Sequence, residues 1–272
     1  MHEVDFDVTG KKAVITGAGG IICGVMAREM AKKGMEVALL DLAVENAQKI
    51  ADEINAGGGK AIAVKANVLD RKSLEMARDE VMDKFGRVDV LVNGAGGNKK
   101  EATTSPELDF FHLDENAFRW VFDLNVTGAV LTTMVFGEVL AKQGFGNVIN
   151  IASMASYLPL TNTVAYSGAK CAVANFTQWM ATHFNQNYST EIRVNAIAPG
   201  FLLTQQNRFL MQRQDGSPTD RGQRVLNKTP MGRYGEPEEM AGAVIWLCSD
   251  ASSFVNGAVI PIDGGFSAFW GI

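Results

Sequence analysis

The sequence places a tyrosine and a lysine where they could act together on a proton. Tyr166 and Lys170 are four residues apart in the stretch YSGAK, and a helical conformation would put both on one face. A tyrosine that exchanges a proton with an alcohol near neutral pH must have its pKa lowered from ~10 to roughly 7–8. One ammonium group at ~5 Å supplies about 3 kcal/mol toward this change. The pair therefore predicts interconversion of an alcohol and a ketone.

A serine that could assist this pair follows a predicted strand. Ser153 lies in IASMAS, directly after the apolar run 147–151, and its hydroxyl could hydrogen-bond the oxygen of a substrate. Ser156 is the nearest competitor for this role.

The stretch ITGAGGIICG, residues 15–24, is typical of a turn that binds phosphate. Gly17, Gly19 and Gly20 follow a predicted strand and precede a predicted helix, so backbone N–H groups would face a pyrophosphate. Asp41 follows the next predicted strand, 36–40. Its carboxylate would accept hydrogen bonds from the hydroxyls of an adenosine ribose and would repel a 2′-phosphate. The sequence therefore predicts NAD rather than NADP as the cofactor.

Short β-rich runs alternate with amphipathic stretches along the chain. Most of the runs are continuously apolar, as in strands that are covered on both faces. This alternation predicts one doubly wound α/β domain with a parallel sheet over residues 1–272. The expected strands are 12–16, 36–40, 61–65, 88–92, 147–151, 192–197 and 258–262, and the expected helices include 22–33, 44–56, 71–85, 117–142, 165–187 and 237–249.

Composition excludes several classes of protein. The net charge of −5 without a basic run argues against nucleic acid or an anionic membrane surface as a partner. The N-terminus lacks the apolar core of a signal peptide, and no uncharged apolar stretch approaches eighteen residues. We therefore expect a cytoplasmic protein without a membrane span.

Cysteines and histidines do not cluster in the sequence. The cysteines are far apart among apolar neighbours, which favours reduced thiols over disulfides or a metal site. We expect no metal, and we expect Cys23 to pack on the inner face of its helix without redox chemistry. The residues in question are Cys23, Cys171, Cys248, His2, His112 and His183.

Seven motifs occur in an order that resembles the short-chain dehydrogenase/reductase family over nearly the whole chain. They are TGAGG, NGAG (93–96), LN (124–125), IASMAS, YSGAK, VNAIAPG (194–200) and DGG (263–265). The resemblance implies a Rossmann-type seven-stranded sheet and a catalytic tetrad of Asn125, Ser153, Tyr166 and Lys170. Tyr166 would exchange the proton and Ser153 would orient the carbonyl. Lys170 would lower the pKa of the tyrosine and hold the nicotinamide ribose, and Asn125 would support a relay water.

The resemblance also implies where the cofactor binds. The half up to about residue 150 would hold it, and residues 151–272 would carry the catalytic and substrate groups. The expected cofactor residues are Gly17, Gly19, Gly20, Ile21, Ile22, Asp41, Asn67, Val68, Asn93, Gly94, Ala95, Tyr166, Lys170, Pro199, Gly200, Phe201, Leu202 and Thr204.

The chain departs from the family pattern at four positions. Ile21 and Cys23 stand where T-G-x-x-x-G-x-G has glycine. Asn67 replaces the usual aspartate after the third strand, and Gly94 replaces the second asparagine of N-N-A-G. We expect the pyrophosphate site to be retained, because Gly19 and Gly20 still allow a tight turn.

Two segments are expected to contact the substrate. The segment after strand 88–92 carries Lys99 and Lys100, and a lid at 201–235 carries Asn207 and several arginines, with Gln205 and Gln206 adjacent. Cations and amides suit a small sugar acid. The first loop and GAGGNKKEATT are also similar to those of D-mannonate oxidoreductases. We predict a sugar acid such as D-mannonate as substrate, bound by Lys99, Lys100, Ser153, Tyr157, Asn207 and Arg208.

Alternative functions remain open at this point. The same fold could serve as a 3-oxoacyl-carrier-protein reductase, as another alcohol or polyol dehydrogenase, or as a dinucleotide sensor without catalysis. The resemblance further implies a homotetramer that packs through helices around 117–142 and 165–187. The apolar C-terminus FSAFWGI is expected to lie against another subunit.

Overall fold

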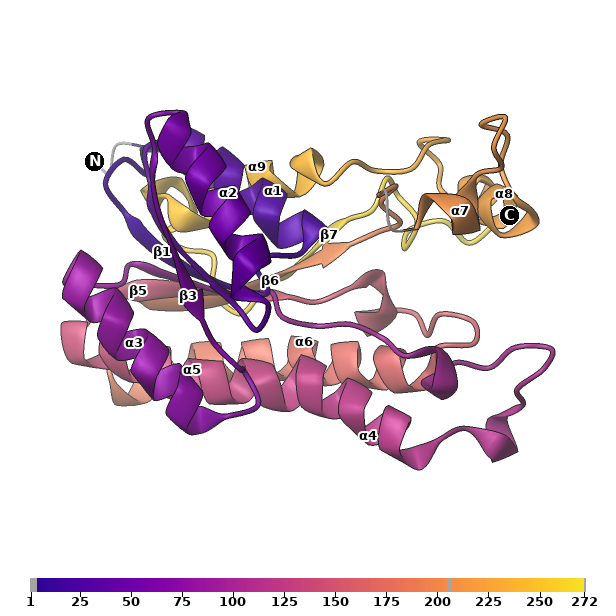
Figure 1. Ribbon diagram of the computed structural model, residues 1–272, viewed down its shortest axis with the longest axis horizontal. Coiled ribbons are helices and arrows are strands. Elements are labelled where there is room, and N and C mark those ends of the chain that lie inside the picture. Colours follow the sequence, from indigo (N-terminus) through magenta and orange to yellow (C-terminus); the bar gives the residue numbers. More distant parts are fainter. Residues whose placement is uncertain (1–3, 205–206, 272) are drawn as a thin grey trace.

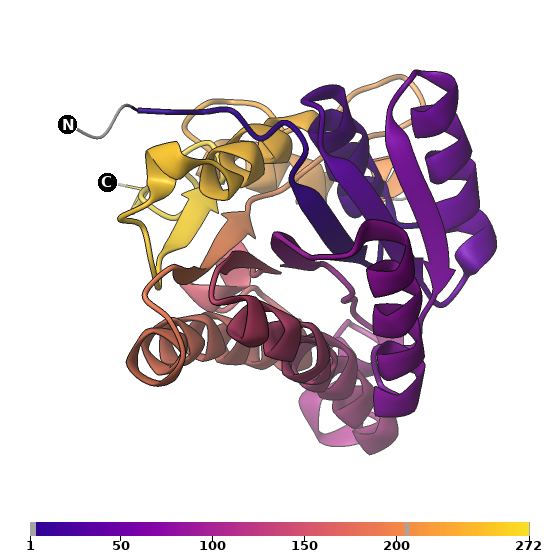
Figure 2. The ribbon, with the colours of Figure 1, turned by 90° about the vertical axis from the view of Figure 1, so that its left-hand side faces the viewer.

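A computed structural model describes residues 4–204 and 207–271 of the protein. Its centre is a seven-stranded parallel sheet between two layers of helices (Figures 1 and 2). The strand order is β3-β2-β1-β4-β5-β6-β7, so the order reverses between β1 and β4. The strands are β1 Lys12–Thr16, β2 Glu36–Asp41, β3 Lys60–Lys65, β4 Val90–Asn93, β5 Gly146–Ile151, β6 Ile192–Pro199 and β7 Val259–Ile262. The predicted single doubly wound domain is confirmed.

Each face of the sheet packs against its own helices. One layer contains α1 Ile21–Lys32, α2 Val44–Ala56 and α9 Glu238–Cys248, and the other contains α3 Arg71–Phe85, α5 Gly128–Gln143 and α6 Val164–Asn187 (Figure 2). Ala13 and Ile15 of β1 pack in the first layer, and Val14 between them packs in the second. Burial on both faces explains why the strands are continuously apolar.

The least regular segments also contain short helices. α4, Glu115–Phe122, continues into a π-helical turn, Asp123–Thr127, and then into α5. The predicted helix 117–142 is therefore divided by a wider turn that hydrophobic periodicity does not reveal. α7, Arg208–Met211, and α8, Asp220–Lys228, lie in the predicted lid, beyond the carboxyl ends of the strands at the right of Figure 1. His2, Gln205 and Gln206 lie outside the described residues.

One helical run, Glu115–Gln143, is long and apolar enough to cross a membrane by length and composition alone. More than half of its most apolar window, 56%, is buried inside the protein. Val135, Phe136 and Leu140 belong to the core of the second layer. The hydropathy of this run is accounted for by its packing in the fold.

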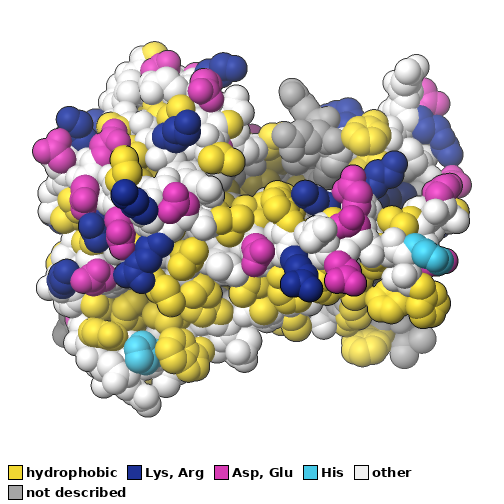
Figure 3. All heavy atoms as spheres, turned by 60° about the horizontal axis from the view of Figure 1, so that its bottom comes forward, with side chains coloured by type: hydrophobic (Ala, Val, Ile, Leu, Met, Phe, Trp, Pro, Cys, Tyr) yellow, Lys and Arg dark blue, Asp and Glu magenta, His cyan; other side chains and the backbone are white. Residues whose placement is uncertain are grey.

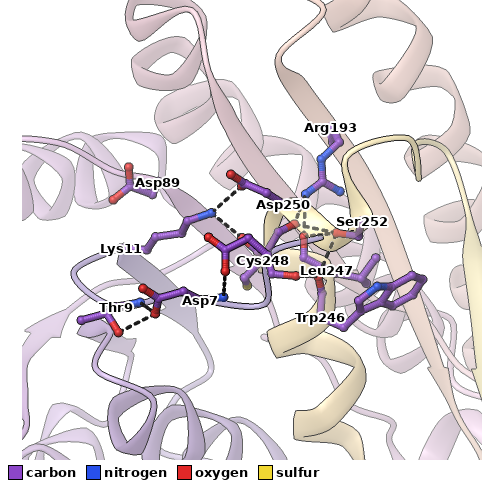
Figure 4. A network of polar contacts seen from close by, with 12 residues as sticks. Asp7, Thr9, Lys11, Asp89, Arg193, Trp246, Leu247, Cys248, Asp250 and Ser252 are labelled. Atoms are coloured by element: carbon purple, nitrogen blue, oxygen red, sulfur yellow. Dashed lines mark hydrogen bonds and ion pairs between the residues drawn. The ribbon is translucent and has the colours of Figure 1, made fainter. Parts of the chain in front are cut away.

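A polar network closes the amino-terminal edge of the sheet (Figure 4). Lys11 Nζ donates to the Cys248 carbonyl oxygen at 2.9 Å and forms an ion pair with Asp250 at 3.1 Å. The buried Arg193 guanidinium donates to the Leu247 carbonyl oxygen at 2.8 Å. These bonds satisfy carbonyls at the end of α9, which an α-helix leaves without intrahelical partners. This edge is thus structural, and the opposite edge carries the polar loops.

Candidate active site

The glycine turn is held in one conformation by its neighbours. Gly17 has a φ of +65°, and a Cβ at this position would lie 2.8 Å from Ala95 Cα, so both backbone angle and space require glycine. The Thr16 hydroxyl accepts hydrogen bonds from the N–H groups of Gly94 and Ala95, at 3.1 and 3.2 Å. α1 begins at Ile21 without a side-chain cap. Its first N–H groups have no intrahelical partners and can bind an anion.

Asp41 connects the end of β2 to this turn. Its Oδ2 accepts the Gly19 N–H at 2.9 Å, and its Oδ1 accepts the Ala43 N–H at 2.9 Å. Each carboxylate oxygen can accept a further hydrogen bond. Asp41 can therefore brace the turn and accept from two hydroxyl groups at once.

Tyr166 and Lys170 lie one turn apart near the start of α6. Lys170 Nζ is 5.6 Å from the centroid of the Tyr166 ring and donates to the Ile151 carbonyl oxygen at 2.8 Å. Burial lowers the pKa of Lys170 to about 8. Burial also raises the pKa of Tyr166, and a hydrogen bond with the Ser153 side chain opposes this shift. The net pKa shift of the tyrosine is thus upward, because desolvation outweighs the hydrogen bond with Ser153, and the lowering that we expected from Lys170 does not contribute to it.

Ser153 rather than Ser156 faces this pair. Ser153 follows β5, is 7% exposed, and its Oγ accepts the Ala155 N–H at 3.1 Å. Ser156 turns away and donates to the Lys170 carbonyl oxygen at 2.7 Å. The geometry therefore selects Ser153 as the serine that can contact a substrate oxygen.

Asn125 lies in the π-helical turn and joins the helix to the loop after β4. Its Nδ2 donates to the carbonyl oxygens of Val121 and Gly97, each at 2.7 Å, and its Oδ1 accepts the Gly97 N–H at 3.2 Å. A Cβ at Gly96 would lie 2.6 Å from Asn125 Oδ1 and 3.3 Å from Lys170 Nζ. The amide of Asn125 and the ammonium group of Lys170 therefore lie beside the same glycine.

A cleft of about 690 Å³ runs between the glycine turn, the tyrosine and the predicted lid. It lies at the carboxyl ends of the strands, where such folds bind ligands at the reversal of strand order. The predicted residues that line it are Gly17, Gly19, Gly20, Ile21, Ile22, Asp41, Gly94, Ser153, Tyr166, Pro199, Gly200, Phe201, Leu202, Thr204 and Asn207. Asn125 and Lys170 lie behind this lining, 2% and 5% exposed.

Besides Lys170, four predicted cofactor residues do not line the cleft. Asn93 points into the core, where its Nδ2 donates to Thr133 Oγ1 at 2.9 Å and to Asn150 Oδ1 at 2.8 Å. Val68 is buried beside Gly128, and Ala95 packs in the second layer. Asn67 Oδ1 accepts the Leu69 N–H at 3.0 Å and so closes a local turn. The side chains of all four serve the fold in this structure, and their contact with the cofactor stays a prediction. The four are Asn67, Val68, Asn93 and Ala95.

Four of the predicted substrate residues lie outside the lining of the cleft. Lys99 lies over the Trp120 ring, 4.5 Å from its centroid, and Lys100 is exposed outside the cleft. The Tyr157 hydroxyl donates to the Val259 carbonyl oxygen, away from the cleft. Arg208 bonds Gln212 at 3.1 Å on an exposed face. The side chains of Lys99, Tyr157 and Arg208 are thus directed elsewhere in this structure, and contact of all four residues with the substrate stays a prediction.

Asn207 lines the cleft with its side chain already engaged. Its Nδ2 donates to the Leu202 carbonyl oxygen and its Oδ1 accepts the Thr204 N–H, both at 2.8 Å. Through these two hydrogen bonds, Asn207 holds the start of the lid segment in place.

Sequence reasoning missed several residues of the lining. Gly96 stood in the NGAG motif and could have been included, and Arg221 was expected only as one of the lid arginines, together with Arg208 and Arg213. Nothing in the sequence placed the others. The full set is Cys23, Asn46, Gly96, Ile151, Ala152, Leu160, Leu210, Met211 and Arg221. Among the described lining residues, Arg221 is the only lysine or arginine.

Helix α8 presents Arg221 from a closely packed junction. The Thr219 hydroxyl accepts the Gly222 N–H at 3.0 Å and donates to the Leu210 carbonyl oxygen at 2.7 Å. A Cβ at Gly222 would overlap the Met211 carbonyl oxygen, so the start of α8 packs directly on the end of α7. The Arg213 guanidinium is paired with Asp220 at 3.2 Å. Arg221 thus supplies positive charge to the cleft from a fixed helix end.

Comparisons with known proteins agree with this site. A family model described as Enoyl-(Acyl carrier protein) reductase matches residues 17–267. The uncharacterized oxidoreductase UxuB of Bacillus subtilis is 47% identical over 100% of this chain and 99% of its own length. A crystal structure from Haemophilus influenzae with bound NAD, provisionally assigned as a D-mannonate oxidoreductase, is 47% identical. It has a TM-score of 0.92 and covers 98% of each chain.

A third relative is more distant. A structure from Beutenbergia cavernae with bound NADP, provisionally assigned as an NAD(P)-dependent gluconate 5-dehydrogenase, is 32% identical. It has a TM-score of 0.85 and covers 97% of this chain and 99% of that one. With the predicted fold, the Ser–Tyr–Lys arrangement and the glycine turn in place, the chain belongs to the short-chain dehydrogenase/reductase family of oxidoreductases.

Proposed function

We propose that the protein is an NAD-dependent oxidoreductase that interconverts a secondary alcohol and a ketone. The observation that carries this proposal is the convergence of Ser153, Tyr166, Lys170 and Asn125 on one cleft that begins at a glycine turn. NAD, when bound, supplies the acceptor for a hydride from the alcohol carbon. The NAD-bound relative at 47% identity supports this choice of cofactor.

The chain's own groups account for the proton. Tyr166 Oη takes the proton from the alcohol, or returns it in the reverse direction, because it is the phenol that lines the cleft beside Ser153. The Ser153 hydroxyl orients the substrate oxygen. Lys170 provides positive charge near the ring, and Asn125 holds the loop beside that ammonium group. The upward pKa shift of Tyr166 means that this positive charge has to offset the cost of burying a phenolate.

We assign the adenosine end of the cleft to Asp41. Asp41→Asn removes the negative charge and keeps one acceptor oxygen for the Gly19 N–H. We expect the ratio of kcat/KM for NADP to that for NAD to rise about tenfold, which corresponds to 1.4 kcal/mol of relieved repulsion. Asp41→Ala should also reduce the difference in kcat/KM between NAD and NADP. It should lose more NAD affinity than Asp41→Asn, because the turn also loses the hydrogen bond from the Gly19 N–H.

The check is steady-state kinetics with both cofactors. Asp52→Asn in the exposed part of α2 is the control, and it should leave the ratio unchanged. A wild-type protein that used NADP as well as NAD would contradict the role of Asp41.

For the substrate we propose a sugar acid such as D-mannonate, with D-fructuronate as its ketone. A carboxylate in the cleft needs a cation, and Arg221 is the cation among the described lining residues. Arg221 therefore takes the part that we expected of Lys99, Lys100 and Arg208. The residues around 201–235 are proposed as the substrate lid. The relatives provisionally assigned to D-mannonate and gluconate support this substrate class.

The substrate proposal predicts a selective loss in Arg221→Met. With an aldonic acid as substrate, kcat/KM should fall about 10- to 100-fold, because a charge-assisted hydrogen bond in the cleft is lost. With the sugar alcohol that lacks the carboxylate, wild type and variant should be equally slow. Arg224→Met on the same helix, outside the cleft lining, is the matched control.

The outcomes separate the candidate functions. Unchanged kcat/KM when the carboxylate is removed from the substrate would overturn the sugar-acid proposal and favour another alcohol dehydrogenase. Preference for a 3-oxoacyl thioester would favour the carrier-protein reductase. No hydride transfer with the aldonic acid, the sugar alcohol or the 3-oxoacyl thioester, despite NAD binding, would favour a dinucleotide sensor.

We further propose that the protein forms a homotetramer in the cytoplasm. Hydrophobic side chains gather on the surface that Figure 3 turns toward the viewer, over the layer of α4, α5 and α6. There Met134, Trp179 and Tyr188 are 52%, 57% and 59% exposed, and they border a hollow between α5 and α6. Trp270 near the C-terminus is 79% exposed and offers a second apolar contact. All three cysteines are free thiols, which suits a reducing compartment.

A further inference from the structure

Two departures from the family pattern meet in space. Cys23 stands in the first turn of α1, and Gly94 follows β4, 71 residues later in the sequence. A Cβ built on Gly94 would overlap Cys23 Sγ. The same Cβ would lie 3.6 Å from Cys23 Cβ, which is an ordinary contact. The missing side chain at residue 94 therefore makes room for two atoms, the sulfur of Cys23 and the Thr16 carbonyl oxygen.

The Cys23 thiol lies in the wall of the cleft. Cys23 is 5% exposed, packs in the core of the first layer and also lines the cleft. The charged groups that act on it are Lys170 and Asp41. The thiol is thus close enough to sense both the catalytic lysine and the aspartate that is assigned to the adenosine end. The expectation that Cys23 packs on the inner face of the helix is correct, but it omitted the contact with the cleft.

The Cys23 thiol is unreactive at this position. Burial raises the pKa of Cys23 to about 12, so it is a neutral thiol at physiological pH and a poor nucleophile. Its contribution is therefore its volume and its position.

We propose that Cys23 and Gly94 form a complementary pair that positions the first turn of α1 against the loop after β4 and so sets the affinity for the cofactor's pyrophosphate. This inference rests on the proposed binding of NAD. Cys23 and Gly94 are positioning residues. They fix the distance between two neighbouring backbone segments at the cleft, Ile21–Cys23 and Gly94–Gly96, whose residues other than Ala95 line it. An added methyl group at residue 94 would force the thiol, and with it the N–H groups of the helix start, out of place.

A double-mutant cycle tests the pair. Gly94→Ala should raise the Kd for NAD, and for ADP-ribose as a probe without nicotinamide, about tenfold or more. Cys23→Ala alone should change either Kd less than about threefold. The double variant removes the sulfur and adds the methyl group, so its Kd should recover most of the way toward wild type. Recovery should be incomplete, because a Cβ at residue 94 also lies 2.8 Å from the Thr16 carbonyl oxygen.

The kinetic readout distinguishes positioning from a general effect on stability. At saturating NAD, kcat should stay within about threefold of wild type in all three variants, while KM for NAD follows the Kd. Cys248→Ala deletes an equally buried thiol away from the cleft, and Gly242→Ala adds a methyl group with no atom within 4 Å. The first should lower Tm, the second should raise it slightly because alanine is the better helix former, and neither should alter the Kd for NAD.

Each outcome decides the question. Equal Kd values for Gly94→Ala and the double variant, or no effect of Gly94→Ala, would overturn the pairing. If Gly94→Ala does not fold, a folded double variant supports the pairing and an unfolded one overturns it. Failure of the wild type to bind NAD would instead overturn the proposed cofactor.

Discussion

Tyr166→Phe is expected to lower kcat by a factor of roughly 10²–10⁴ while the Kd for NAD stays within a few-fold of wild type. The substitution removes only the phenolic oxygen, which is the atom assigned to proton transfer. The ring still packs beside Ala165 and fills the same wall of the cleft. Binding of the cofactor does not depend on the hydroxyl group. Single-turnover hydride transfer and a separate binding measurement would separate the two effects.

The control for this experiment is Tyr157→Phe. Tyr157 is nine residues earlier, and its hydroxyl donates to the Val259 carbonyl oxygen outside the cleft. The Tyr157→Phe variant should retain a kcat within a few-fold of wild type. Substantial turnover in Tyr166→Phe, or an equal loss in both variants, would remove Tyr166 from the proposed mechanism.

Lys170→Met should damage both rate and cofactor binding. We expect kcat at pH 7 to fall about 10²–10³-fold, because one preorganised charge beside the phenol is lost. The Kd for NAD should also rise, because the ammonium group is assigned to the nicotinamide ribose as well. Burial is nearly retained with methionine, so the fold should tolerate the change. A kcat loss without any change in the Kd for NAD would contradict the second role.

The lowered pKa of Lys170 adds a dependence on pH. The ammonium form is present below about pH 8 and is lost above it. The part of the rate that depends on this charge should therefore decline as the pH rises through about 8, and Lys170→Met should lack this decline. The stability of the folded protein changes with pH in the opposite direction. Between about pH 8 and 10.5 the unfolded chain holds a proton that the folded chain has released, so this group makes wild type more stable as the pH rises. Unfolding of both proteins by urea at the two ends of this range would show the difference.

The fold was predictable because burial on both faces of a sheet leaves a direct signal. Runs such as Lys12–Thr16 are apolar at successive positions, and the structure buries Val14 on one face and Ile15 on the other. Tyr166, Lys170 and Ser153 were predictable because they belong to a motif whose spacing on α6 and β5 is geometrically restrictive. Asp41 was predictable from the length of one βαβ unit.

The direction of a side chain in a loop carries no such signal. Asn93 was expected at the cofactor, yet its side chain points into the core. Asn207 does line the cleft, but its amide group is bonded to its own loop. An asparagine has the same sequence signal in either role. Lys99 was expected at the substrate, but its ammonium group lies over an aromatic ring of α4. Arg221 was one of several lid arginines, and the sequence could not distinguish it from the others because its helix is short and lies in the least regular segment.

The π-helical turn at Asp123–Thr127 lets one helical run pack against two different parts of the fold. A π turn holds about one residue more than an α turn, so the side chains before it are rotated by about 100° relative to those after it. Ala117 and Val121 consequently pack against Ala165 of α6, whereas Phe136 packs under the sheet. In evolutionary terms, a one-codon insertion is the smallest change that could create this turn from a regular helix. The same extra residue frees the Val121 carbonyl oxygen for Asn125. The rotation of the helix and the position of the Asn125 amide therefore depend on the same extra residue.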